Sequence, residues 1–272
     1  LGKDAASTDT PLPCVDFDGN DHLQIAYSSD FDLSNNDFTI ECYAKTTDAS
    51  TNYPSIVGRW QQNGAAHWDF RPASDDASHN FFFIYHTGSA NITVNSGASI
   101  TDGQWHHIAV AREGSNLRMF VDGALVHTHN IGNTTISNST SVPLYLGYDP
   151  YGSSYYNGQT SNLRIVVGTA LYTAAFTKPT TPLTNVTNTK LLCFQSDTSV
   201  TTAAVAPNAL TVQSGDPEAR SVSDSDWAVN NIDAGFTPGK LYKSSTLYLT
   251  KSNILSNATL IDGGSSLSSE YL

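Results

Sequence analysis

Basic residues are scarce in this sequence. Its 272 residues include 13 Lys and Arg but 25 Asp and Glu, so the formal net charge is −12 at pH 7. Because phosphate binding needs a basic face, this balance excludes nucleic acid as an expected partner. Anionic membrane surfaces are excluded for the same reason. The excess of acid predicts high solubility, and cation binding is the alternative interpretation.

Cysteine is also scarce. The three cysteines are an odd number, so they cannot form a closed disulfide framework. Cys42 lies in an apolar strand pattern and is predicted to be a buried thiol. Cys14 and Cys193 are candidates for a disulfide, and two separate thiols are the alternative. The three are too scattered along the chain to indicate a zinc site.

Long apolar runs and methionine are lacking as well. No apolar run approaches the roughly 20 residues of a membrane-spanning helix, so no membrane insertion is expected. The chain begins at Leu1, and its only methionine is Met119. From this we expect that further residues precede Leu1 in the gene product.

Paired catalytic carboxylates are missing from the strand patterns. Glycoside hydrolases hold two carboxyl groups about 5–10 Å apart across the scissile bond. The four glutamates (Glu41, Glu113, Glu218 and Glu270) have no acidic residue two positions away on a predicted strand. Asp16 and Asp18 have that spacing but run into a turn, and the histidines show no charged partners in the sequence. We therefore expect no enzymatic activity.

Short strand patterns are abundant. In residues 38–45, apolar Phe38 and Ile40 alternate with Thr39 and Glu41, which predicts a strand with Glu41 on the outward face. Residues 105–112 and 117–126 follow similar patterns. Asp122-Gly123 interrupts the second of these and predicts a two-residue hairpin turn in which both residues take φ > 0.

Further strand patterns recur about every ten residues, separated by clusters of Gly, Asn, Asp and Ser. They cover residues 15–17, 22–26, 55–61, 67–70, 80–86, 142–147, 161–167, 190–195 and 209–213. Helix is scarce, with one turn predicted at residues 168–172. This pattern is typical of an all-β sandwich or barrel.

The two ends of the chain differ from its centre. Residues 1–13 are polar, contain two prolines and predict an N-terminal arm. Residues 228–272 hold strand patterns at 241–249 and 254–261, which are too few to form a stable unit alone. We predict a C-terminal extension that serves assembly or docking. The domain between the two ends is predicted to span residues 14–227.

Four segments together resemble the laminin-G-like, concanavalin A-like lectin/glucanase superfamily. They are residues 15–23, residues 37–43, the hairpin that contains 105–107 and 119–123, and residues 158–172. The last segment continues through 176–183 and 190–193, and this long signature is similar to a variant found in structural proteins of tailed bacteriophages. The resemblance covers about residues 14–227. It implies an all-β fold, an antiparallel jelly-roll β-sandwich of the concanavalin A-like type.

The resemblance also implies a candidate calcium site. Many laminin-G-like domains bind calcium through Asp and Asn oxygens at a loop edge. Asp18, Asn20 and Asp21 form such a cluster, and Asn162 occupies a position where calcium-binding relatives often carry an acid. A polar turn closed by Asx hydrogen bonds is the alternative interpretation.

A loop rich in tyrosine is the candidate carbohydrate site. Aromatic faces stack on sugar rings, and neighbouring Asp and Asn side chains bind hydroxyl groups. The residues concerned are Tyr148, Asp149, Tyr151, Tyr155, Tyr156 and Asn157. A protein interface is the alternative, because tyrosine is enriched there too.

These observations predict a non-enzymatic structural protein of a bacteriophage virion, as a capsid decoration, tail or fibre component. Its expected partners are copies of itself, other virion proteins and host cell-surface glycans, and its expected location is the virion surface. The first alternative is a secreted lectin or adhesin, supported by Asn-X-Ser/Thr sequons at Asn91, Asn133, Asn138, Asn185 and Asn257. The second alternative is a glycoside hydrolase.

Overall fold

The computed structural model describes residues 12–48, 53–61, 67–73 and 79–221, together with four short strands between residues 242 and 267. The chain divides into two units, residues 1–222 and residues 223–272. The described part of the first unit is built from β-strands, with one short 3-10 helix, η1, at Ser29–Phe31. No helix among the described residues is long and apolar enough to cross a membrane.

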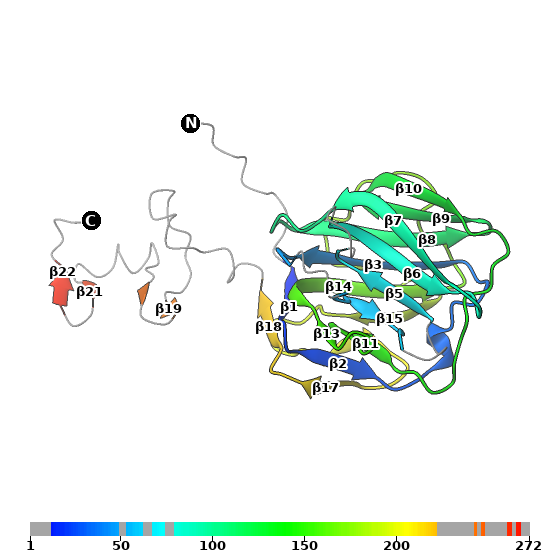
Figure 1. Ribbon diagram of the computed structural model, residues 1–272. Helices are drawn as coiled ribbons and strands as arrows, with labels where there is room; N and C mark the ends of the chain where they lie inside the picture. Colours follow the sequence, from blue (N-terminus) through cyan, green and yellow to red (C-terminus); the bar gives the residue numbers. More distant parts are fainter. Residues whose placement is uncertain are drawn as a thin grey trace. The chain divides into compact units, whose positions relative to one another are not determined.

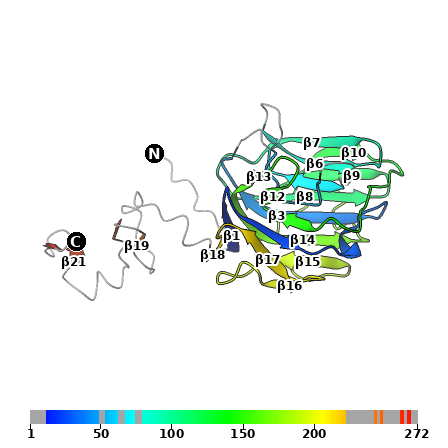
Figure 2. The ribbon, with the colours of Figure 1, turned by 60° about the horizontal axis from the view of Figure 1, so that its bottom comes forward.

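The first sheet has nine antiparallel strands. Its main path runs β10 (Ala124–Asn130), β9 (Asn116–Val121), β8 (His106–Glu113), β3 (Phe38–Lys45), β14 (Asn157–Val167), β1 (Pro13–Asp18) and β18 (Glu218–Ser221). Two further strands branch from it, with β15 (Thr189–Cys193) on β14 and β16 (Ala203–Val205) on β15. The early part of the long strand β14 pairs with β1 and its later part with β15, so β14 organises this sheet (Figure 2).

The second sheet has seven antiparallel strands. They follow the order β17 (Leu210–Ser214), β2 (His22–Ile25), β11 (Leu144–Leu146), β4 (Val57–Gly58), β5 (Trp68–Arg71), β6 (Asn80–His86) and β7 (Asn91–Ser99). In Figure 1, β6 and β7 lie in front of β8 and β9 of the first sheet. A separate small hairpin, β12 (Tyr148–Asp149) with β13 (Ser154–Tyr155), follows β11.

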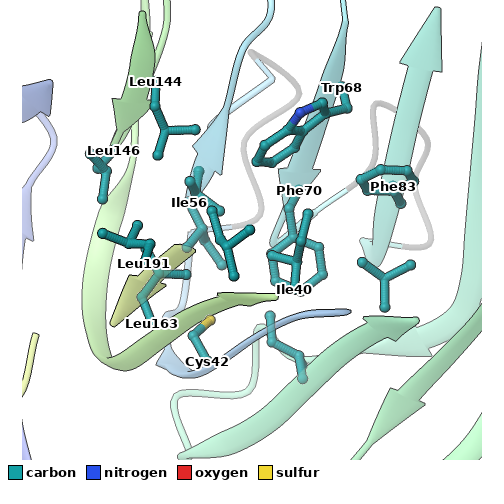
Figure 3. Close-up of a cluster of buried hydrophobic side chains, with 14 of the residues drawn as sticks. Ile40, Cys42, Ile56, Trp68, Phe70, Phe83, Leu144, Leu146, Leu163 and Leu191 are labelled. Atoms are coloured by element: carbon teal, nitrogen blue, oxygen red, sulfur yellow. The ribbon is translucent and has the colours of Figure 1, made fainter. Parts of the chain in front are cut away.

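The core fills the space between the two sheets. Alternate residues of each strand point inward, so Ile40 and Cys42 of β3 meet Trp68 and Phe70 of β5 in one buried cluster (Figure 3). Cys193 joins this cluster as a free thiol, so it does not pair with Cys14. Two layers around one apolar core confirm the predicted all-β antiparallel sandwich.

Several strand predictions are confirmed in detail. β3 and β6 span the predicted residues 38–45 and 80–86. The hairpin between β9 and β10 turns at Asp122 and Gly123, whose φ angles of 49° and 81° are both positive, as a type I′ turn requires. Gly123 also leaves no room for a side chain, because an added Cβ would lie 2.0 Å from the carbonyl oxygen of Phe176.

Other predictions of local structure were wrong. Residues 168–172 form no helical turn, and β7 was missed although Ile92 and Val94 alternate with polar residues in its first half. Glu41 lies on the outward face, as its strand pattern predicts, but it is fully buried there. The reason is that the long connection between β14 and β15 lies over the outward face of the first sheet. Thr39 Oγ1 donates to the carbonyl of Thr169, and Tyr172 and Phe176 pack on Phe120.

Glu41 is the centre of a buried polar network under this connection. Its Oε1 accepts hydrogen bonds from Nε and Nη2 of Arg164 at 2.9 and 2.6 Å. Its Oε2 accepts one from the hydroxyl of Tyr172 at 2.8 Å and lies 2.9 Å from Nε2 of His107. Burial raises the pKa of this carboxyl, but His107 and Arg164 together outweigh that effect, so its pKa is lowered.

Two histidines therefore have charged partners that the sequence did not reveal. His107 pairs with Glu41 across neighbouring strands. His106 lies between two carboxylates, 2.7 Å from Asp122 and 3.1 Å from Asp102, and the Asp122 hydrogen bond is the main reason that its pKa is raised.

The predicted arm and extension fall mostly outside the described residues. Of the arm, residues 1–11 are not described, and Pro13 already begins β1. In the extension, the predicted strand at 241–249 is instead a hairpin of β19 (Tyr242–Lys243) and β20 (Thr246–Leu247). Of the predicted strand at 254–261, residues 254–259 lie outside the described residues, and the last two lie in β21 (Leu260–Asp262), which pairs with β22 (Ser265–Leu267).

We predict that Glu41→Ala lowers the free energy of unfolding by about 3–5 kcal/mol, because it leaves the buried Arg164 guanidinium without its counter-charge. Urea unfolding followed by tryptophan fluorescence measures this loss. Glu113→Ala is the matched control, because Glu113 is half exposed and pairs with Arg118 at the surface. That variant should lose about 1 kcal/mol or less. Equal losses in the two variants would contradict the role assigned to Glu41.

Candidate functional site

A cluster of aromatic side chains lies on the outer face of the second sheet, away from the core. In β11, Leu144 and Leu146 point into the core, so Tyr145 between them points outward. In β2, Leu23 and Ile25 point inward, which places His22 on the same outer face. The β12–β13 hairpin adds Tyr148 and Tyr155 as a directly opposed pair.

We call His22, Tyr145, Tyr148 and Tyr155 the aromatic platform. The rings of His22 and Tyr148 are stacked, with centroids 4.6 Å apart and an angle of 19° between their planes. Tyr155 lies 4.7 Å from Tyr148, and Tyr145 lies 6.1 Å from it. All four side chains are half-buried, so the platform presents a continuous aromatic surface that is partly open to solvent.

The platform carries no positive charge at neutral pH. Burial lowers the pKa of His22 below its usual value, so the ring is neutral at pH 7. Nδ1 of His22 lies 2.8 Å from Oγ of Ser214 in the neighbouring strand β17. Oγ of Ser214 lies 2.9 Å from the carbonyl oxygen of Asn20. These contacts fix the ring against the edge of the second sheet.

Asp149 holds the hairpin that carries Tyr148 and Tyr155. Its carboxylate accepts a hydrogen bond from the backbone N–H of Tyr151 at 2.8 Å, which closes the turn between β12 and β13. It also accepts one from Nη2 of Arg71 at 2.8 Å. Because Arg71 lies in β5, this ion pair fastens the hairpin to the middle of the second sheet.

Arg71 joins Asp149 to a second buried carboxylate. Nε of Arg71 donates to Asp69 at 2.6 Å, and Oγ of Ser55 donates to the other oxygen of Asp69. The guanidinium carbon lies 5.2 Å from the ring centroid of Tyr53, 5.7 Å from Phe82 and 5.9 Å from Trp60. Both carboxylates and the arginine are buried, so this group is fixed beside the platform.

Burial raises the pKa of Asp69 to about 7, against the opposing effect of Arg71. The nearby charge of Asp149 raises it further, because two carboxylates share one guanidinium. The pKa of Asp149 is also raised, again chiefly by burial. The pair therefore holds a proton at mildly acidic pH.

The structure brings together only part of the predicted carbohydrate site. Tyr148 and Tyr155 lie in the platform, and Tyr151 is 51% exposed at the hairpin tip. Asp149 is buried, and its carboxylate is occupied by Arg71. Tyr156 is fully buried in the core, where its ring packs 5.9 Å from Phe17. The side chain alternates away from Tyr155, so it cannot join the platform.

Asn157, the last predicted carbohydrate residue, is exposed at the start of β14 opposite Asp18. The residues that the sequence did not indicate are His22, Tyr145, Asp69 and Arg71. Tyr145 could be identified as outward-facing from the Leu144–Leu146 alternation. Nothing local to the sequence, however, places β2 and β5 beside the tyrosine loop.

The predicted calcium residues separate into two places. The backbone N–H of Asp18 donates to Asp21, and the backbone and side-chain N–H groups of Asn20 donate to the Asp18 carboxylate. Asp21 also accepts from the backbone N–H of Asp216. These are the Asx hydrogen bonds of the alternative interpretation.

Asn162 lies apart from this turn. Asn157 is the register partner of Asp18, and Asn162 lies five positions beyond Asn157. Five positions correspond to about 15 Å along the strand. The side-chain oxygen of Asn162 accepts from the N–H of Leu183 and from the Gln195 amide. Within the described part of the chain, no group of three His, Cys, Asp or Glu side chains is arranged to hold a metal ion. Calcium binding at residues 18–21 stays a prediction.

Comparison with known proteins agrees with this fold. The model of the concanavalin A-like lectin/glucanases superfamily matches residues 17–171, more than half of the chain. A candidate carbohydrate-binding protein of Bacteroides ovatus aligns with a TM-score of 0.59 at 13% identity, over 78% of this chain and 60% of that one.

Two other solved structures are similar to smaller extents. Domains LG4-5 of the mouse laminin alpha1 chain align with a TM-score of 0.45 at 18% identity, over 71% of this chain and 50% of that one. Domain 4 of the arabinanase AbnA from Geobacillus stearothermophilus was solved with arabinotriose. It aligns with a TM-score of 0.44 at 18% identity, over 55% of this chain and 68% of that one. At 13% identity, the likeness to the Bacteroides protein shows the fold alone.

We predict that Asp69 makes the protein less stable as pH rises from 4 to 7. Its pKa is about 7 when folded and about 3.9 when unfolded, so the folded state binds the extra proton in this range. The stabilisation is complete below pH 4 and is lost as pH passes 7. Relative to Asp69→Asn, the wild type should lose up to about 1.4 kcal/mol per pH unit.

Urea unfolding at pH 5, 6, 7 and 8 measures this difference. Asp197→Asn, in the exposed loop between β15 and β16, is the control and should run parallel to the wild type. A pH profile for Asp69→Asn that is also parallel to the wild type would show that Asp69 does not carry the proton.

Proposed function

The chain belongs to the concanavalin A-like lectin/glucanases superfamily, and we propose that it is a non-enzymatic carbohydrate-binding module, a lectin or adhesin. Its ligand site is the aromatic platform on the outer face of the second sheet. The observation that carries this proposal is the cluster of four half-buried rings, His22, Tyr145, Tyr148 and Tyr155, which is held in place from two sides.

The chemistry of the platform suits a sugar ring. The apolar C–H face of a pyranose packs on an aromatic face, and the tyrosine hydroxyls remain at the rim to bind sugar hydroxyls. The rings are restrained before a ligand arrives, because His22 is held by Ser214 and the hairpin by Asp149. A restrained surface loses little conformational entropy on binding.

The candidate carbohydrate-binding protein of Bacteroides ovatus supports this proposal as a structural relative. The present chain spans 60% of that protein, so the comparison extends to the shared sandwich alone. The aromatic platform itself is the argument that is specific to this chain.

The buried carboxylates support a binding role over a hydrolytic one. Asp69 and Asp149 do lie close together, which the sequence patterns had not indicated. Both are buried, however, and both bind Arg71. A hydrolase needs one carboxyl group to protonate the leaving group and the other to attack the sugar or activate water. Neither Asp69 nor Asp149 faces solvent, where a substrate would lie.

Two settings are proposed for this module. The first is secretion, and the second is the surface of a virion. The support is the signature at residues 158–172, 176–183 and 190–193, which resembles structural proteins of tailed bacteriophages. In that setting its partners are copies of itself and other virion proteins. If so, the protein should sediment with intact phage particles in a density gradient. Recovery only as a freely secreted monomer would contradict the virion setting.

We predict that Tyr148→Ala and Tyr155→Ala each weaken glycan binding at least about fivefold, because each removes a stacking ring worth about 1 kcal/mol. Tyr148→Phe and Tyr155→Phe keep the ring and should bind within about twofold of the wild type. Binding is measured on immobilised polysaccharides by affinity electrophoresis, with the sugar recovered intact.

The control for this series is Leu125→Ala on the edge strand β10 of the other sheet. Leu125 is 41% exposed, so its loss changes an apolar surface without touching the platform. Equal effects of Leu125→Ala and the tyrosine variants would place the ligand elsewhere. Release of reducing sugar by the wild type would overturn the non-enzymatic assignment.

A further inference from the structure

We infer that the platform selects uncharged saccharides over sulfated or uronic acid-containing ones. This inference rests on the proposed carbohydrate-binding function and names the class of its ligand. Two observations carry it: the cations described between residues 12 and 221 are all occupied, and the exposed residues Asp18 and Asp216 lie in the turn next to His22.

The first observation is the state of the basic residues. Nine Lys and Arg lie among the described residues between 12 and 221, and seven of them pair with carboxylates. These seven are Arg59, Arg71, Arg118, Arg164, Lys178, Lys190 and Arg220. Arg112 is buried and donates to four backbone carbonyls, and Lys45 is engaged as well.

Arg71 is the arginine that binds Asp149 in the hairpin of the platform. Its guanidinium is 2% exposed and already bound by two carboxylates, so it has neither the access nor the unpaired charge to bind an anion. Sulfate and carboxylate groups on sugars are recognised by charge-assisted hydrogen bonds from Arg or Lys. The described residues therefore offer an anionic sugar no counter-charge at the platform.

The second observation is the acidic turn next to His22. Asp21 precedes His22 in the chain, and the backbone of Asp216 binds the Asp21 carboxylate. Asp18 lies in the same turn, and Asp216 is exposed two residues beyond Ser214, which contacts His22. Charges in this turn act over about 8 Å at physiological salt, so they repel an anionic ligand stacked on His22.

The test compares polysaccharides that differ only in charge. Pairs such as dextran and dextran sulfate, or xylan and glucuronoxylan, share a backbone and are immobilised at equal density. The full chain is applied at pH 7 in 150 mM salt. In each pair whose neutral member binds, the charged member should bind at least tenfold more weakly. The difference in binding between the neutral and the charged member should widen at 20 mM salt, because the charges are then screened less.

A charge reversal tests the cause of the selectivity. Asp216→Lys places a cation beside the platform and should narrow the gap between neutral and charged members at least threefold. Glu113→Lys makes the same charge change at the β8–β9 turn of the first sheet and should leave the gap unchanged. An equal effect of the two variants would show that the net charge of the protein, and not the acidic turn next to His22, sets the preference for neutral saccharides.

The outcomes separate this inference from the proposed function. Tighter binding of the charged members, abolished by Tyr148→Ala, would overturn the inference and leave the carbohydrate function standing. Binding of neither class, or binding that Tyr148→Ala and Tyr155→Ala do not change, would overturn the proposed site and the inference with it. Neutral binding that depends on both tyrosines, with at least tenfold weaker binding of the charged members, supports the two together. Equal binding of the two members would overturn the inference alone.

Discussion

The guanidinium of Arg71 binds Asp69 on its own strand and Asp149 on a hairpin far along the chain. This double ion pair fixes where the β12–β13 hairpin lies on the second sheet, and with it the positions of Tyr148 and Tyr155. Loss of Arg71 would leave two buried carboxylates without their counter-charge, so the arrangement is held strongly in one geometry. The aromatic platform depends on this geometry, because two of its four rings come from that hairpin.

The first sheet has a similar buried ion pair on its own outer face. There Arg164 binds Glu41, and the long connection between β14 and β15 covers the pair. In both sheets the apolar residues of the core hold the sandwich together. A buried arginine then holds one outer segment in place, the β12–β13 hairpin on the second sheet and the β14–β15 connection on the first. Buried ion pairs of this kind contribute more to a single arrangement than to net stability. They suit a protein whose surface must present preformed loops.

The sequence was a good guide to the inner faces and a poor one to the outer faces. The period-2 alternation in residues 38–45 and the Asp122-Gly123 turn each predict their structure correctly, because both signals are local. Burial of Glu41 depends on a connection more than a hundred residues later in the chain. Tyr156 was predicted beside Tyr155 in one site, yet alternation sends its ring into the core. Asn162 is likewise tied to Leu183 and Gln195, partners that no local pattern reveals.

The ring cluster of His22, Tyr145, Tyr148 and Tyr155 is the surface on which we expect a neutral saccharide to bind. The most direct measurement is the aromatic region of the NMR spectrum during titration with a neutral oligosaccharide. We expect saturable shifts of the ring signals of these four residues, with the rings of the buried Phe70 and Phe83 unchanged. Saturable shifts confined to residues of the first sheet would contradict this expectation.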